Sequence, residues 1–189
     1  MDEQEWVSLV RARLAPLLGD HVPPLMIDQG IRLAYASEIR AYEQAKPIKR
    51  DLSRYQTDLL VRETLEDGGW KPRVVIEAKL RSVTTHDAIT YSEKALNHKK
   101  VHPYLRYGII LGNRRHYPLP GRLYRHGAYF DFMVSWHFHE PSGAELQRLC
   151  DLVFEEVRAS RDLEDILYSS RKPDRRRFTF LHRPLRLEE

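Results

Sequence analysis

Three side chains between residues 58 and 79 have the types and the spacing to bind a divalent cation beside an amine. Asp58 begins the apolar run TDLLV, and Glu77 and Lys79 lie inside a second apolar run, VVIEAKL. Mg²⁺ is usually held by one or two carboxylates and keeps its other positions for water and phosphate oxygens. A lysine can lower its pKa when it is desolvated, which suits it to proton transfer. These residues fit a site for a divalent cation that keeps positions for a phosphate ester.

Both apolar runs are predicted to be strands of one β-hairpin. The dipeptide at 67–68 is Asp-Gly, a strong turn signal, and a turn centred there pairs apolar residues with each other, such as Leu59 with Ile76. In that register Asp58 faces Glu77, with Cβ atoms about 5 Å apart. Like charges in that position destabilise a sheet. Either a cation lies between them, or they form the solvated polar end of the sheet.

A third carboxylate, Glu38, is expected on the inward face of a helix over residues 29–45. Ile31, Tyr35 and Tyr42 share its three- and four-residue spacing, which is typical of a buried helix face. Buried carboxylates are rare unless they are paired or bound to metal. Glu38 is therefore expected either at the same cation or in a buried ion pair with an arginine.

The other elements form an α/β pattern, with residues 46–54 left ambiguous. The sequence predicts helices over 3–18, 84–100 and from 142, a shorter helical piece at 162–168, strands at 107–112 and 128–138, a long loop at 113–127 and a terminal strand near 175–183. Strands mixed with helices predict one mixed sheet flanked by helices on both faces. We expect a single domain over residues 1–170 and a basic tail over 171–189.

A helix carrying Glu38, then TDLLV, then VVIEAKL, then a helix and a strand resembles the PD-(D/E)XK nuclease superfamily. The resemblance covers about residues 31–112 and implies the restriction-endonuclease-like fold. Thr57 stands where that family has a proline. The family would make this chain a metal-dependent endonuclease that hydrolyses phosphodiester bonds of DNA, of restriction, defence or repair type.

The resemblance also implies a role for each residue of the motif. Asp58 and Glu77 would be the principal metal ligands, the carbonyl of Ala78 would add a third oxygen, and Glu38 would help to hold the same or a second metal. Lys79 would orient or activate the attacking water. The implied cofactor is Mg²⁺, for which Mn²⁺ can substitute, and the implied partner is DNA, with RNA not excluded. Symmetric double-strand cutters of the family resemble dimers, so a homodimer is left open.

Basic and aromatic residues outside the motif are candidates for contact with nucleic acid. They are Tyr91 and Lys94 on the helix after the motif, Arg114 and Arg115 in the following loop, and Arg175, Arg176 and Arg177 in the tail. Residues 171–189 hold seven basic and three acidic side chains, which accounts for the whole net charge of +4. A basic patch is typical of a protein that binds a polyanion, although solvated surface charge is the alternative for each group.

Composition excludes several other classes. No apolar run of about 18 residues is present, so no membrane span and no membrane partner are expected. The acidic start MDEQEWVSLV does not resemble a secretory signal, and the single cysteine, Cys150, excludes an internal disulfide. We therefore expect a cytoplasmic protein. The alternatives to a nuclease are a non-catalytic nucleic-acid-binding module on the same fold and a protein-interaction domain.

Overall fold

A five-stranded mixed sheet forms the centre of the protein. The computed structural model describes residues 1–19, 21, 24–114 and 119–169. The strands lie in the order β1 (Leu25–Gln29), β4 (Leu59–Thr64), β5 (Trp70–Leu80), β6 (Arg106–Gly112) and β7 (Phe132–Ser135). The pairs β1–β4 and β4–β5 are antiparallel, whereas β5–β6 and β6–β7 are parallel.

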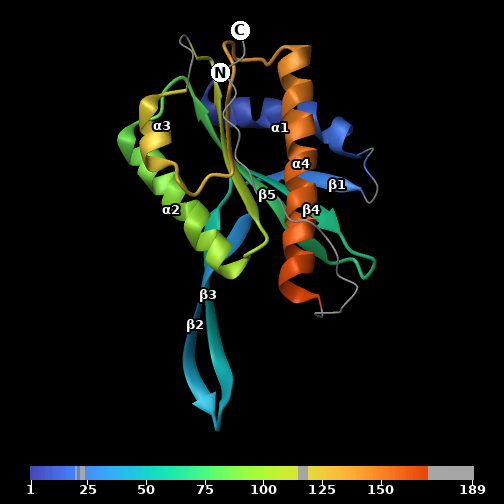
Figure 1. The fold of residues 1–189 in the computed structure, drawn as a ribbon, viewed down its shortest axis with the longest axis vertical. Helices are drawn as coiled ribbons and strands as arrows, with labels where there is room; N and C mark the ends of the chain where they lie inside the picture. Colours follow the sequence, from blue (N-terminus) through green and yellow to red (C-terminus); the bar gives the residue numbers. More distant parts are fainter. Residues whose placement is uncertain (20, 22–23, 115–118, 170–189) are drawn as a thin grey trace.

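Helices cover both faces of this sheet, which confirms the predicted mixed α/β architecture. Helices α1 (Glu3–Gly19) and α4 (Gly143–Tyr168) lie on one face, and α2 (Thr85–Val101) and the short α3 (Gly121–His126) lie on the other (Figure 1). Alternation along β5 explains the two cores, because Val74, Ile76 and Ala78 face α1 and α4 while Val75 faces α2. Strand β5 is therefore buried on both sides, and its side chains are held firmly.

The predicted helix over 29–45 is wrong. The chain there forms β2 (Arg32–Glu43), which pairs with β3 (Lys46–Gln56) in a separate two-stranded ribbon. We call residues 32–56 the arm, because Figure 1 shows this ribbon extending alone from the body. Bulges interrupt β2 between Ala34 and Ala36 and between Ile39 and Ala41. The bulges break the two-residue alternation that marks a strand. The apolar residues of β2 therefore recur at three- and four-residue spacings, which are also typical of a helix.

Other boundaries also differ from the sequence-based prediction. The ambiguous stretch 46–54 belongs to β3, and β1 was not predicted. The predicted loop 113–127 contains α3, and the strand predicted over 128–138 is limited to β7. The helix predicted from 142 and the shorter piece at 162–168 form one continuous helix, α4, which ends at Tyr168. The terminal strand and the basic tail lie outside the described residues.

The predicted register of the β4–β5 hairpin is confirmed at its core. Leu59 pairs with Ile76 and Val61 pairs with Val74. A bulge after Val61 shifts the pairing towards the turn, so Thr64 pairs with Trp70 around a five-residue loop. The left-handed φ of 82° at Gly68 explains the glycine in that loop.

Gly112→Ala is expected to destabilise the protein by about 1–3 kcal/mol. A Cβ atom at Gly112, where β6 ends, would lie 2.2 Å from the ring of Trp6, which is fully buried in α1. Urea unfolding measures the loss. Gly143→Ala is the control, since its Cβ meets nothing within 4 Å. Equal stability of Gly112→Ala and wild type would contradict this packing.

Candidate active site

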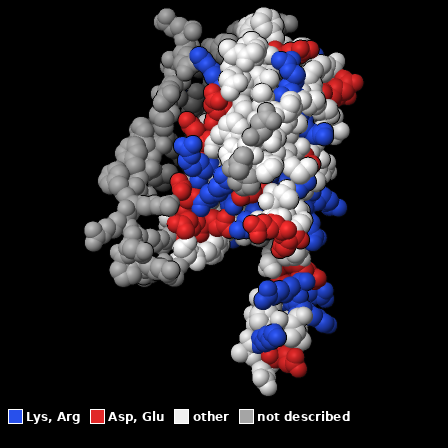
Figure 2. All heavy atoms as spheres, turned by 90° about the vertical axis from the view of Figure 1, so that its right-hand side faces the viewer, with Lys and Arg blue, Asp and Glu red and all other residues white. Residues whose placement is uncertain are grey.

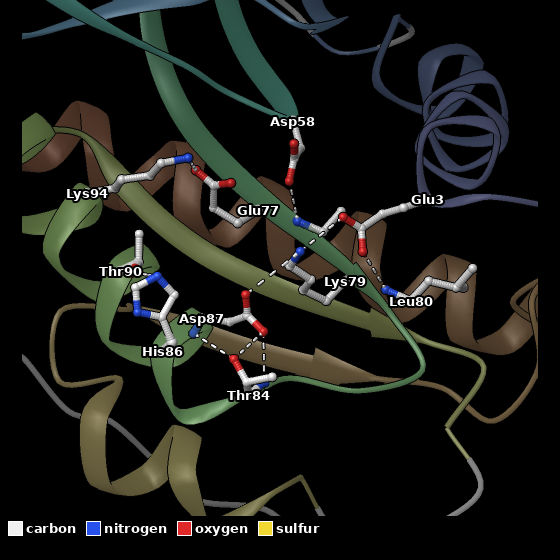
Figure 3. Close-up of polar contacts among 11 residues, drawn as sticks. Glu3, Asp58, Glu77, Lys79, Leu80, Thr84, His86, Asp87, Thr90 and Lys94 are labelled. Atoms are coloured by element: carbon white, nitrogen blue, oxygen red, sulfur yellow. Dashed lines mark hydrogen bonds and ion pairs between the residues drawn. The ribbon is translucent and has the colours of Figure 1, made fainter.

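Asp58 lies at the junction between the arm and the sheet. It immediately precedes β4, and its Oδ2 accepts a hydrogen bond of 2.9 Å from the backbone N–H of Ala78 on β5 (Figure 3). The preceding residue, Thr57, is fully buried and donates both its N–H (2.9 Å) and its Oγ1 (3.0 Å) to the carbonyl of Ile31. A proline at position 57 could not donate that N–H. Thr57 thus closes the base of the arm and fixes Asp58 against β5.

Glu77 is the buried carboxyl of the site, with 1% of its surface exposed. Its Oε1 accepts a hydrogen bond from the hydroxyl of Tyr107 on β6, whereas its buried Oε2 has no hydrogen-bond donor among the described residues. Burial, and then the charge of Asp58, raise the pKa of Glu77 to about 8, although Lys94 and Tyr107 act in the opposite direction. Because the charge of Asp58 contributes to this increase, the two carboxyls lie close together. In this state Glu77 is largely protonated at neutral pH.

Lys79 lies two residues further along β5 and is surrounded by hydrogen-bond acceptors. Its Nζ is 3.1 Å from Oε1 of Glu3 and 4.0 Å from Oδ1 of Asp87 (Figure 3). It also lies 5.3 Å from the ring centre of Tyr91. Burial alone would lower the pKa of Lys79, but hydrogen bonds and charge from Tyr91 and Glu3 raise it above its ordinary value. The lowered pKa that the sequence suggested is therefore not found, and Lys79 is a cation at neutral pH.

Lys94 on α2 supplies a second cation on the other side of Glu77. Its Nζ is 3.8 Å from Oε1 of Glu77, 4.9 Å from the ring centre of Tyr91 and 5.8 Å from that of Tyr55 in the arm. The sequence placed Tyr91 and Lys94 on a helix face that could contact nucleic acid. Both turn towards the cluster, where Lys94 partly neutralises Glu77, and their contact with nucleic acid stays a prediction.

Glu38 does not belong to this site, which corrects the sequence-based expectation. It lies on β2 in the arm, is exposed, and is the cross-strand partner of Asp51 on β3. The expectation required an inward-facing helix, and the structure has no helix at that position. Two carboxylates, Asp58 and Glu77, remain together.

Arg114 lies at the end of β6, on the same edge of the sheet as Lys79. Its Nη1 donates to the carbonyl of Arg81, 3.0 Å away, directly after β5. It therefore braces the ends of two neighbouring strands. The other predicted contacts, Arg115, Arg175, Arg176 and Arg177, lie outside the described residues.

Two residues that the sequence did not single out complete the cluster. Glu3, in the first turn of α1, links the Lys79 amine to the backbone N–H of Leu80, which lies 3.2 Å from its Oε2. An acidic residue in the first turn of a helix is ordinary, so nothing in the sequence marked it. Tyr107 begins the buried part of β6, and its position in an apolar run gave no sign that its hydroxyl meets Glu77.

The cluster concentrates charge at one end of the β4–β5 pair, on the face covered by α2. The carboxyl of Asp58 lies beside that of Glu77, and Lys79 lies on the same face of β5 as Glu77. Within the described parts of the chain, no group of three or more His, Cys, Asp or Glu side chains is placed to hold a metal ion. The protein-derived oxygen ligands of a cation here would therefore come from Asp58 and Glu77, with backbone and water oxygens in addition.

The fold and this cluster define a mixed α/β protein in which a buried carboxyl, Glu77, lies beside the half-buried Asp58 at one end of the central strands. The chain matches no protein-family model and none of the curated proteins with which it was compared. None of the described helices is both long enough and apolar enough to cross a bilayer. What the cluster does must accordingly be argued from its chemistry.

Proposed function

We propose that this protein is a Mg²⁺-dependent nuclease that hydrolyses phosphodiester bonds of DNA, on a fold of the restriction-endonuclease type. The observation that carries the proposal is the Glu77 carboxyl, which is buried against Asp58 with one oxygen lacking a donor and with Lys79 on the same face of β5. A pair selected only for stability would avoid such an arrangement. An endonuclease of restriction, defence or repair type in the cytoplasm is the finer form of the proposal.

The order of elements around the cluster supports the finer fold assignment. Strands β4 and β5, helix α2 and strand β6 follow one another in the chain and are neighbours in space. This is the order that the resemblance to the PD-(D/E)XK superfamily requires, and β4 and β5 bring the aspartate and the glutamate of the motif to the same place. Glu38, which the resemblance also used, does not contribute.

The residues present fit a divalent cation. The free oxygen of Glu77 and the neighbouring carboxylate of Asp58 are hard ligands of the kind Mg²⁺ prefers, and one or two carboxylates suffice when water and phosphate fill the other positions. Their mutual repulsion, which raises the pKa of Glu77, is the interaction that a bound cation relieves. Mg²⁺ held there would supply Lewis-acid activation of the phosphodiester and of the attacking water.

Lys79 would act as a fixed positive charge. Because its pKa is raised, its Nζ stays protonated and stabilises negative charge that develops on the phosphate oxygens. Glu3 and Tyr91 hold the amine, so Lys79 is positioned before substrate binds. This role differs from that of a general base, which would need a lowered pKa.

The direct test is cleavage of plasmid and linear duplex DNA by the purified chain with Mg²⁺. We expect nicking or degradation that EDTA stops and that Asp58→Ala reduces by roughly a thousandfold or more, because removal of a metal ligand also removes the activation of water. Gel electrophoresis of the products measures the rate. If wild type and Asp58→Ala leave several DNA and RNA substrates equally intact, the protein is a non-catalytic binding module or an interaction domain.

Glu38→Ala is the matched control for that experiment. It removes a carboxylate of the original motif, but the residue is exposed in the arm and faces Asp51 rather than Glu77. Cleavage by Glu38→Ala is expected to stay within a few-fold of wild type. A loss as large as that of Asp58→Ala would contradict the position of β2.

A further inference from the structure

The arm leaves the body directly beside the carboxylate pair. Strand β3 ends at Gln56, and Asp58 follows after the buried Thr57. The base of the arm is held firmly, because the Nδ1 of His98 on α2 lies 3.1 Å from the carbonyl of Ala34, and the rings of Tyr35 and Tyr55 stack with centres 3.7 Å apart. A carbonyl only accepts, so Nδ1 carries the proton. The arm is therefore a fixed extension of the site rather than a loose loop.

The two faces of the arm differ in charge. Alternate residues of a strand share a face, and cross-strand partners lie on the same side. One face carries Arg50, Leu52 and Arg54 of β3, opposite Ile39, Ser37 and Ala34 of β2. We call it the arginine face. Glu38 and Asp51 lie on the opposite face, where Arg40 pairs with Asp51 at 2.9 Å.

The arginine face combines positively charged and apolar side chains, and it carries no carboxylate. Arg50 and Arg54 are exposed and make no ion pair with any described residue. Leu52, which lies between them, and Ile39, which is paired with Arg50, are 47% and 45% exposed. An isolated two-stranded ribbon is only marginally stable in water. Figure 2 shows the outer part of the arm standing clear of the described body, with Lys and Arg side chains around its middle. Its exposed apolar groups therefore indicate a partner.

Charge selects the kind of partner. The arm holds six basic and three acidic residues, and all the charge on the arginine face is positive. Pairing with the arginine face of a second copy about a twofold axis would bring four arginines together without a carboxylate, which is unfavourable. A polyanion with apolar groups between its charges matches the face better.

We propose that the arm lies along the major groove of duplex DNA that is bound at the carboxylate pair, with Arg50 and Arg54 at the phosphates and Ile39 and Leu52 towards the base edges. The major groove of B-form DNA accommodates a two-stranded β-ribbon, and apolar side chains contact thymine methyl groups there. The 12 residues of β2 span about 40 Å, close to one turn of the duplex. The inference rests on the proposed nuclease function and specifies its substrate as double-stranded DNA.

The test measures binding of the full chain to a duplex of about 30 base pairs, in EDTA so that cleavage plays no part, at several salt concentrations. Arg50→Ala/Arg54→Ala is expected to weaken binding roughly tenfold or more and to reduce the slope of log K against log salt by about two, one for each lost phosphate contact. Fluorescence anisotropy gives both quantities. Circular dichroism checks that the variant is folded.

Two further variants distinguish specific binding by the arm from the effect of the protein's overall positive charge. Arg50→Lys/Arg54→Lys keeps both charges and is expected to retain most of the affinity. Arg148→Ala/Arg158→Ala removes two exposed arginines from α4, on the opposite side of the sheet from the site, and is expected to keep the wild-type slope. Equal loss in both alanine pairs would overturn the arm as a specific contact.

Other outcomes also decide the inference. It is overturned if wild type binds no duplex, if the arm variant binds like wild type, or if duplex RNA depends on the arm more strongly than DNA does. It is also overturned if sedimentation shows a wild-type dimer that the arm variant converts to a monomer. Arm-dependent binding without Mg²⁺-dependent cleavage by wild type would end the nuclease proposal and leave the DNA contact intact.

Discussion

Glu77→Gln is expected to stabilise the protein at pH 8 while ending Mg²⁺-dependent cleavage. Glutamine keeps the shape of the side chain and a carbonyl that accepts from Tyr107, but it carries no charge to bury beside Asp58. Burial and Asp58 raise the pKa of Glu77 from 4.5 to about 8. That difference corresponds to about 5 kcal/mol of cost when Glu77 is fully ionised in the folded, metal-free protein.

The sign of the pH dependence follows from proton binding. Between pH 4.5 and about 8 the folded protein holds a proton on Glu77 that the unfolded chain releases, so the contribution of Glu77 to stability is largest below pH 4.5 and is lost as pH rises to about 8. Urea unfolding in EDTA at pH 5, 6.5 and 8 should show wild type losing stability relative to Glu77→Gln. Parallel stability curves for the two proteins would contradict the burial of this carboxyl.

Metal binding should mirror this behaviour. A cation must displace the proton of Glu77, so the apparent affinity of wild type for Mg²⁺ or Mn²⁺ is expected to rise with pH up to about 8 and then level off. Isothermal titration calorimetry in buffers of different ionisation enthalpy measures the proton released. Glu77→Gln is expected to bind neither ion at the site, which separates the loss of metal from any change in folding.

Lys79→Met is expected to reduce cleavage of DNA by about a hundredfold or more at every pH, with metal affinity nearly unchanged. Methionine has a similar length and removes the charge that would stabilise the phosphate oxygens, a contribution typically worth about 10² to 10³ in rate. Single-turnover cleavage with enzyme in excess isolates the chemical step. The structure gives Lys79 no direct contact with Asp58 or Glu77, so the metal ligands should keep their arrangement.

Lys94→Met is the matched comparison for Lys79→Met, because it removes the other lysine of the cluster. Lys94 lies 3.8 Å from Oε1 of Glu77 and lowers the pKa of that carboxyl. Its loss should move the acidic limb of the pH–rate profile to higher pH, with activity largely recovered above pH 8. If Lys94→Met loses activity at all pH values and Lys79→Met does not, Lys94 rather than Lys79 is the cation that acts on the substrate.

The hairpin could be predicted from sequence because its information is local. Asp67-Gly68 marks a turn, and the apolar residues on either side can be paired in few ways, so the register that brings Asp58 beside Glu77 followed from a single short stretch. The bulge after Val61 was not predictable, since no residue type encodes it. It lies towards the turn and does not disturb the site.

The arm could not be predicted because it lacks the pattern on which such predictions depend. Most of its residues are exposed on both faces, so no apolar alternation marks the strands. In the sequence, Ile31, Tyr35, Glu38 and Tyr42 recur at the three- and four-residue spacing of a helix. Glu38 was predicted at the site only because of this spacing. The structure places it on a β-ribbon, away from the site.

Glu3 was missed for a different reason. It lies 76 residues from Lys79, and their meeting depends on how α1 packs across the end of β5. That packing in turn depends on the ring of Trp6, which occupies the space that a side chain at position 112 would fill. The sequence predicts the helix that carries Glu3, but nothing in it predicts the contact between Glu3 and Lys79.

The closure at the base of the arm makes the outer part of this ribbon independent of the packing of the body. The backbone N–H of Thr57 donates to Ile31, that of Gly30 donates to Thr57, and Gln29 pairs directly with Leu59, so the chain leaves the body and returns at the same point. Leu33, Tyr35 and Tyr55 pack at the base, so shortening the arm outside these residues would leave the five-stranded sheet intact. Ribbons of other lengths and sequences could be accommodated at that junction, so substrate preference could diverge while the carboxylate pair is inherited unchanged.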